Sequence, residues 1–108
     1  MNIGQIAKMA QQMQTQMAQA QDELKETTLE VTAGGGAVRI VITGAQEVRS
    51  VEIDPSAVDP DEVDMLQDLV MTAMNEAIAR SKELERERMG RIAGGMGLPG
   101  MPGLLGFG

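Results

Sequence analysis

The side chains whose type and spacing suggest chemistry are bases near the end of a long helical pattern. Five of them fall between positions 80 and 91, among only three acids. They are Arg80, Lys82, Arg86, Arg88 and Arg91. Guanidinium groups hold phosphates by charge and by paired hydrogen bonds. These residues therefore favour the binding of a polyanion.

The residue types that enzymes use most are absent from the chain. It has no histidine and no cysteine, and Phe107 is its one aromatic residue. The commonest general bases, nucleophiles and transition-metal ligands are therefore missing. An enzyme using carboxylates alone would need a pocket that raises carboxylate pKa values, and no spacing here favours a particular pair. We expect a protein that is not an enzyme and has no small-molecule substrate.

Two patterns that resemble ligand-binding motifs lack their remaining parts. After the run Gly34-Gly35-Gly36, Arg39 stands where a dinucleotide fingerprint needs its third glycine, and no Lys-Ser/Thr pair of a phosphate loop follows. The four aspartates between Asp54 and Asp64 lack the spacing of a calcium loop. We expect a hairpin turn and helix caps instead, with neither a cofactor nor a metal.

Charge and composition limit the partners further. The formal net charge of −7 argues against coating nucleic acid through overall positive charge, so an anionic partner must be met locally. The apolar runs are too short to span a membrane, and the N-terminus lacks the apolar core of a signal peptide. We expect one soluble, cytoplasmic domain with no membrane contact.

The five bases lie on a predicted second helix that runs from Asp59 to about Ile92. Asp59 can cap it, Pro60 suits its first turn, and Gly94 and Gly95 end it. An apolar stripe along this helix predicts burial against a sheet. Its residues are Val63, Leu66, Val70, Ala73 and Ala77, widened by Leu69, Met74 and Ile78.

Three short segments before this helix alternate between apolar and polar residues, as strands buried on one face do. They cover residues 29–33, 38–43 and about 50–53. The glycines at 34–36 suit a tight hairpin between the first two. The prediction is a three-stranded antiparallel meander, which needs helices to cover one face.

A first helix is predicted from Ile3 to Glu26. Its apolar residues form a heptad-like seam, whereas the opposite face is rich in glutamine and carries few charges. Lys8 and Lys25 are the only bases of this helix. The seam consists of Ile3, Ile6, Ala10, Met13, Met17, Ala20 and Leu24. The fold class is therefore α+β, in the order α-β-β-β-α.

The second helix is too long for this sheet. About thirty helical residues span about 45 Å, whereas strands of this length cover about 20 Å. An overhanging apolar, methionine-rich surface is best covered by a second copy, so we expect a homodimer in which the methionines fill the core or the dimer seam. Arg80, Leu84, Arg88 and Arg91 continue the arc of the apolar stripe. Because unpaired arginines are costly to bury, the last three turns are predicted to leave the core as a cationic arm.

The last segment differs in composition from the rest. Residues 93–108 are uncharged and rich in Gly, Met and Pro, so we expect a disordered tail after a domain at residues 1–92. Leu98, Leu104, Leu105 and Phe107 make this tail more apolar than an ordinary linker, which leaves docking on the dimer or on a partner open.

The order of these elements resembles the YbaB/EbfC family of bacterial nucleoid-associated proteins. The resemblance rests on three segments: Ala33-Gly-Gly-Gly-Ala-Val-Arg-Ile, Glu47-Val-Arg-Ser-Val-Glu-Ile-Asp-Pro55 and Gly94-Gly-Met-Gly-Leu-Pro99. It implies a tweezers-like homodimer that binds double-stranded DNA and influences nucleoid organisation and gene expression, without enzymatic activity or cofactor. The first helix departs from the family in lacking a strongly basic surface, so residues 80–91 must contribute more.

Two other interpretations stay open. The charge pattern of the second helix also follows from the helix dipole and from Glu76/Arg80 and Glu87/Arg91 pairs. Alternatively, the protein is an acidic adaptor that binds other proteins through its Met-rich helices or its tail. Under the DNA-binding hypothesis, the contacts are Arg80, Lys82, Arg86, Arg88 and Arg91 with Lys8 and Lys25.

Overall fold

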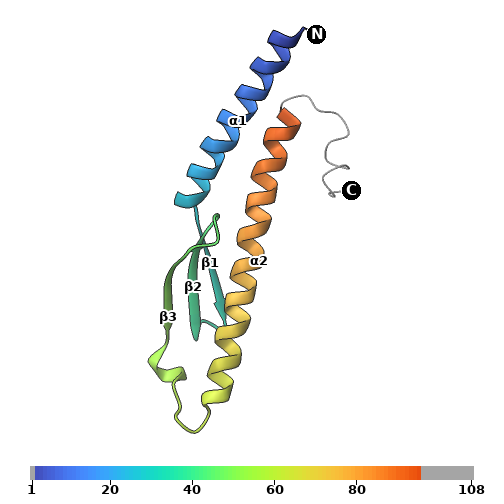
Figure 1. Ribbon diagram of the computed structural model, residues 1–108. Helices are drawn as coiled ribbons and strands as arrows, with labels where there is room; N and C mark the ends of the chain where they lie inside the picture. Colours follow the sequence, from blue (N-terminus) through green and yellow to red (C-terminus); the bar gives the residue numbers. More distant parts are fainter. Residues whose placement is uncertain (1, 96–108) are drawn as a thin grey trace.

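The computed structural model describes residues 2–95, which form a rod of about 70 × 27 × 16 Å (Figure 1). One long helix precedes a three-stranded sheet in the sequence and a second long helix follows it, which confirms the predicted α+β fold. The elements are α1 (Ile3–Glu26), β1 (Thr28–Ala33), β2 (Val38–Thr43), β3 (Val48–Ile53), the short 3-10 helix η1 (Pro55–Ala57) and α2 (Val63–Gly95). Of the predicted tail at 93–108, residues 93–95 belong to α2, and residues 96–108 lie outside the described residues.

The sheet is an antiparallel meander in the order β1-β2-β3. The β1–β2 hairpin turns at Gly34, Gly35 and Gly36, whose φ values of 64°, 68° and 97° lie in the left-handed region that glycine tolerates best. The predicted hairpin is therefore confirmed. The β2–β3 register shifts between Val41 and Ile42, so β3 is the irregular edge of the sheet.

The core lies between α2 and the first two strands. Ala73 and Ala77 are buried in α2, and their small side chains let the helix approach the sheet closely. The buried strand residues are Val31, Val38, Ile40 and Ile42. In contrast, Val48, Val51 and Ile53 of β3 are 40–47% exposed, so the third strand has little cover.

A second contact region joins the helices to the β2–β3 turn. Leu24 at the end of α1 is completely buried beside Gly44 of this turn, and Leu84 of α2 packs against the same glycine. Buried Ser81 donates a 2.6 Å hydrogen bond to the carbonyl oxygen of Thr43. This junction fixes both helices where they leave the sheet.

The boundaries of α2 differ from the prediction at both ends. The helix begins at Val63 rather than at Asp59, because the Asp59 carboxylate accepts the N–H of Asp61 in a local turn. It ends at Gly95, beyond the predicted end near Ile92. The glycines there continue the last turn instead of stopping it. Neither α1 nor α2 is apolar enough over its length to cross a membrane.

Candidate nucleic-acid interface

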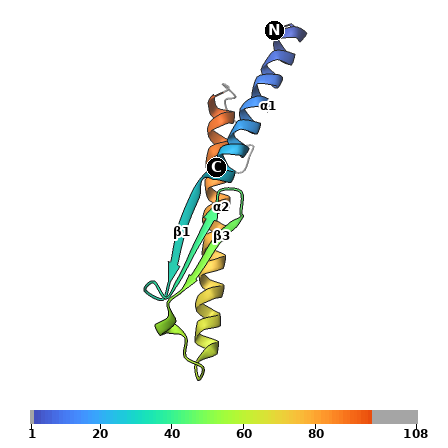
Figure 2. The same cartoon turned by 90° about the vertical axis from the view of Figure 1, so that its left-hand side faces the viewer.

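All seven predicted binding residues lie on a pair of helices that extends beyond the sheet. We call α1 together with residues 80–95 of α2 the two-helix arm. Figures 1 and 2 show the two helices side by side above the sheet, with α1 reaching past the end of α2. A 3.7 Å ion pair between Arg88 Nη1 and Glu23 Oε2 connects them.

The structure corrects the prediction that the last three turns of α2 leave the core. Ser81 is buried, Leu84 is half-buried, and the side chain of Arg88 is only 31% exposed. The first helix overhangs the sheet as well, and it packs against this part of α2. The first helix of the same chain therefore covers this side of α2. The prediction compared the length of α2 with the strands alone and did not consider cover by α1.

All three arginines on the predicted arc have carboxylate partners. Arg80 Nη2 donates to Glu76 Oε1 at 2.7 Å, Arg91 pairs with Glu87, and Arg88 pairs with Glu23. The first two pairs were expected one turn apart on the helix, and both are exposed. Such surface pairs contribute about 0.3–0.5 kcal/mol, so a phosphate can replace the carboxylate at little cost.

Lys82 and Arg86 are the bases of α2 that carry no ion pair within residues 2–95. Both are exposed, and because they are four residues apart they share one side of the helix. Arg80 and Arg91 are about three turns apart and share a different side. The predicted bases of α2 therefore form two stripes rather than one patch.

The two bases of α1 lie far apart. Lys8 is exposed near the N-terminus, whereas Lys25 is exposed in the last turn beside the sheet. They are seventeen positions apart, which is about 25 Å along the helix. Lys25 Nζ also lies 3.9 Å from Asp22 Oδ1. The structure thus brings Lys8 and Lys25 into the arm but not into one cluster.

Charge is divided between the ends of the rod. Residues 80–95 carry five bases and three acids, and residues 2–21 carry Lys8 alone. By contrast, residues 27–78 of the sheet and lower α2 carry ten acids and two bases. The net negative charge is therefore concentrated at the sheet end, and the upper part of the arm is net positive.

The two remaining bases belong to the sheet, and sequence reasoning gave them no role. Arg39 lies between Glu30 and Glu52 on the neighbouring strands, at 2.9 and 3.3 Å, and hydrogen bonding and charge from Glu30, with help from Glu52, raise the pKa of Arg39. Arg49 Nη2 donates to the carbonyl oxygen of Lys25 at 2.9 Å. The alternation of charges on paired strands was the available signal for Arg39.

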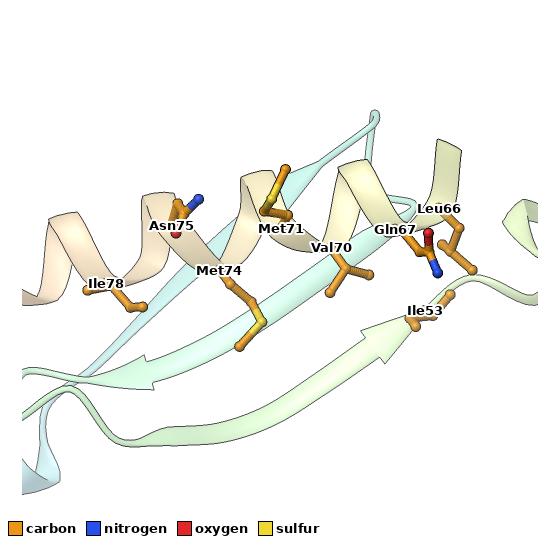
Figure 3. Close-up of a pocket in the computed structure, with 8 residues that line it drawn as sticks. All are labelled: Ile53, Leu66, Gln67, Val70, Met71, Met74, Asn75 and Ile78. Carbon is orange, nitrogen blue, oxygen red and sulfur yellow. The ribbon is translucent and has the colours of Figure 1, made fainter. Parts of the chain in front are cut away.

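An apolar groove of about 500 Å³ lies between α2 and β3 (Figure 3). Met74 and Ile78 are 39% and 38% exposed there, and Ile53 of β3 is 40% exposed. The other lining residues are Leu66, Gln67, Val70, Met71 and Asn75. None of the described residues that line the groove is ionisable. The groove therefore suits an apolar surface rather than a charged ligand.

Metal binding finds no support in the part of the chain that the structure describes. Within residues 2–95, no group of three or more acidic side chains is placed to hold a metal ion. Of the aspartates that were considered for a calcium loop, Asp54 and Asp59 accept hydrogen bonds in local turns, and Asp64 lies in the first turn of α2. Asp54 accepts hydrogen bonds from the N–H and the hydroxyl of Ser56, and these bonds lower the pKa of Asp54.

Comparison with known proteins agrees with this architecture. A nucleoid-associated protein of Acetivibrio thermocellus is 48% identical over 104 residues, covering 96% of this chain and 90% of the relative. A nucleoid-associated protein of Chloroflexus aurantiacus is 49% identical over 96 residues, covering 89% of this chain and 96% of the relative. The crystal structure of the uncharacterized protein HP0035 from Helicobacter pylori shares the fold, with a TM-score of 0.72 at 23% identity, over 81% of this chain and 91% of that one.

The family model that matches is that of the YbaB/EbfC DNA-binding family, and it covers residues 1–96. This family is one of DNA-binding proteins rather than enzymes, in agreement with the expectation from the missing histidine and cysteine. Both the family match and the identity to the relatives extend over nearly the whole chain. The chain therefore belongs to the YbaB/EbfC DNA-binding family.

Proposed function

We propose that this protein binds double-stranded DNA as a homodimer with little sequence preference, works at the nucleoid, and influences nucleoid organisation and gene expression. The observation that carries the proposal is the division of charge along the rod. Seven of the nine bases lie on the two-helix arm, whose upper part is net positive, and ten of the sixteen acids lie within residues 27–78. A polyanion is attracted to the arm and repelled by the sheet end, despite the net charge of −7.

The contacts we propose follow from the exposure of each base. Lys82 and Arg86 are the first phosphate contacts, because both are exposed and neither forms an ion pair within residues 2–95. Arg80 and Arg91 also contact phosphates, which replace the carboxylates of Glu76 and Glu87. Lys8 extends the path along α1. Arg88 and Lys25 contribute charge, and Arg88 also holds α1 to α2 through Glu23.

Such contacts determine the kind of DNA binding. Contacts to phosphate carry no sequence information, and they weaken as salt rises because condensed counterions are no longer released. The arm as described has no aromatic side chain on which an unpaired base would stack, so duplex is preferred over single strands. The relatives named above are called nucleoid-associated proteins, which agrees with this proposal.

Dimerisation is proposed from the apolar surface that one chain leaves uncovered. This region includes Ile53 and Met74, which line the groove between α2 and β3, and Val51 of β3, and all three are exposed. A symmetric pair of chains would cover this region on both partners. The two arms would then project from one dimer and hold a duplex between them, as tweezers do.

A mobility-shift titration of duplex DNA tests the proposal. We expect binding at about 50 mM salt that falls steeply by about 200 mM. If the wild-type protein does not shift duplex DNA even at low salt, the adaptor alternative is favoured. That alternative has one specific observation in its support, since Met9, Met17, Met65, Met71 and Met74 are all exposed in the single chain.

Sedimentation equilibrium tests the dimer separately. We expect Met74→Glu with Ile78→Glu to give a monomer, because both carboxylates would lie in the covered groove. Met65→Glu is the matched control, since Met65 is exposed on α2 outside the groove. A dimer that survives both changes in the groove would contradict this choice of interface.

A further inference from the structure

One apolar face of α1 is covered at its C-terminal end and open at its N-terminal end. Ala20 and Leu24 are buried, whereas Met17, Ile6 and Ile3 are 40%, 53% and 85% exposed. These residues belong to one seam, in the spacing of three and four that puts side chains on a single helix face. The open part of the seam comprises Ile3, Ile6, Ala10 and Met17, which are exposed, together with Met13, which is half-buried.

The seam loses its cover where α2 ends. The Arg88–Glu23 ion pair places these two residues side by side. From there α2 continues for seven residues to Gly95, about 10 Å, whereas α1 continues for twenty residues to Ile3, about 30 Å. The first helix therefore extends about 20 Å past the end of α2. Both ribbon views show α1 reaching beyond α2 (Figures 1 and 2).

The segment that follows α2 has the composition to cover this surface. Residues 96–108 carry no charge and include Leu98, Leu104, Leu105 and Phe107. Thirteen extended residues reach about 40 Å, which is twice the overhang of α1. The N-terminal part of α1 is also nearly neutral, because residues 2–21 carry Lys8 alone, on the side of the helix away from Ile6.

We propose that residues 96–108 fold back onto α1 of the same chain and cover the open part of the seam. Leucine and phenylalanine side chains of the segment pack on Ile6 and Met13, and the hydrophobic effect drives the contact. The same chain is the donor because its own α2 ends beside the seam, so loop closure is short. This surface is separate from the α2–β3 groove, and the proposal does not depend on DNA binding or on the dimer interface.

The sequence supplies a probe for the test. Phe107 is the only aromatic residue of the chain, so its ring protons have no overlap with those of another side chain. In the full-length protein, nuclear Overhauser cross-peaks from this ring report every methyl group that it contacts. We expect cross-peaks to the methyl groups of Ile6 or Met13. The absence of cross-peaks to α1, or cross-peaks confined to Met71 and Met74 of the groove, would overturn the proposal.

Variants of the full chain separate a real contact from a transient one. Ile6→Gln with Met13→Gln should abolish the α1 cross-peaks, since exposed Ile6 and half-buried Met13 both belong to this seam. Met65→Gln, on an exposed position of α2, should leave them unchanged. Persistence of the cross-peaks to α1 in the double variant would refute the assignment of the surface.

A mixed sample distinguishes the donor chain. In a mixture of isotope-labelled and unlabelled protein, filtered spectra show only contacts between chains. We expect the cross-peaks between Phe107 and α1 to be absent from the filtered spectrum, because both groups belong to the same chain. Their retention would show that a second copy supplies the segment, which would overturn the assignment to the same chain.

Discussion

Replacement of Ser81 by alanine tests how the two-helix arm is held on the sheet. Ser81 is fully buried in α2, and its hydroxyl donates to the carbonyl oxygen of Thr43 at 2.6 Å. It also accepts the backbone N–H of Gln46 at 3.1 Å and the side-chain Nε2 of Gln46 at 3.0 Å. Three hydrogen bonds thus connect α2 to the β2–β3 turn at one side chain.

The cost of Ser81→Ala follows from what its partners keep. Each bond contributes about 0.5–1.5 kcal/mol net. The Gln46 N–H retains a 3.2 Å bond to the Thr43 carbonyl, and Gln46 Nε2 retains a 3.0 Å bond to the Gly44 carbonyl. Because every partner keeps another hydrogen bond, each of the three lost bonds should cost a free energy near the lower end of this range. We expect the free energy of unfolding to fall by about 2 kcal/mol.

Urea unfolding followed by circular dichroism measures this loss. Wild type and variant are compared at the same protein concentration, since the proposed dimerisation would make apparent stability depend on concentration. Ser50→Ala is the control, because Ser50 is an exposed serine of β3 and should change stability by less than about 0.5 kcal/mol. Equal losses for Ser81→Ala and Ser50→Ala would refute the view that this hydroxyl anchors the arm.

Other changes have outcomes of different sign. Gly44→Ala should destabilise the protein by about 1–3 kcal/mol, because its Cβ would lie 2.6 Å from Leu24 Cδ2 and 3.2 Å from the Leu24 carbonyl oxygen. Gly90→Ala should stabilise it by about 0.5–1 kcal/mol, since nothing lies within 4 Å of that position in α2 and alanine favours helix; urea unfolding checks both. Ser56→Ala should raise the pKa of Asp54 part of the way to its ordinary value, because it removes the hydroxyl donor and keeps the backbone donor, as a carboxyl NMR titration would show. The lowered pKa means that the stabilisation by ionised Asp54 is present above its unfolded pKa and is lost as pH falls through the folded pKa.

The sequence predicted the fold because each element has a strong local pattern. The alternation at 38–43 matches β2, and the bounds of α1 were predicted correctly at Ile3 and Glu26. The start of α2 was wrong because an aspartate before a proline suits either a helix cap or a turn. Asp59 forms the turn. A helix cap and a turn have the same sequence pattern at this position, so the sequence did not distinguish them.

The site was less predictable because helix periodicity describes one helix at a time. It placed Arg80, Arg88 and Arg91 on one arc, and it also identified the partners of Arg80 and Arg91 one turn away. It did not reveal that α1 packs on this arc or that Glu23 would meet Arg88. Contacts between segments that are sixty-five positions apart depend on the tertiary path of the chain, which local spacing does not encode. The Ser81 network was missed for the same reason.

The salt dependence of duplex binding by an arm variant tests the central claim most directly. Lys82→Gln with Arg86→Gln lowers the net charge by two at the proposed phosphate contacts. Thr32→Glu with Ser50→Glu makes the same change in net charge on exposed strand positions of the sheet. We predict that the arm variant reduces the slope of log K against log salt by about 2 for each engaged chain, whereas the sheet variant leaves the slope unchanged. Equal slopes for wild type and both variants would contradict the assignment of DNA binding to the two-helix arm.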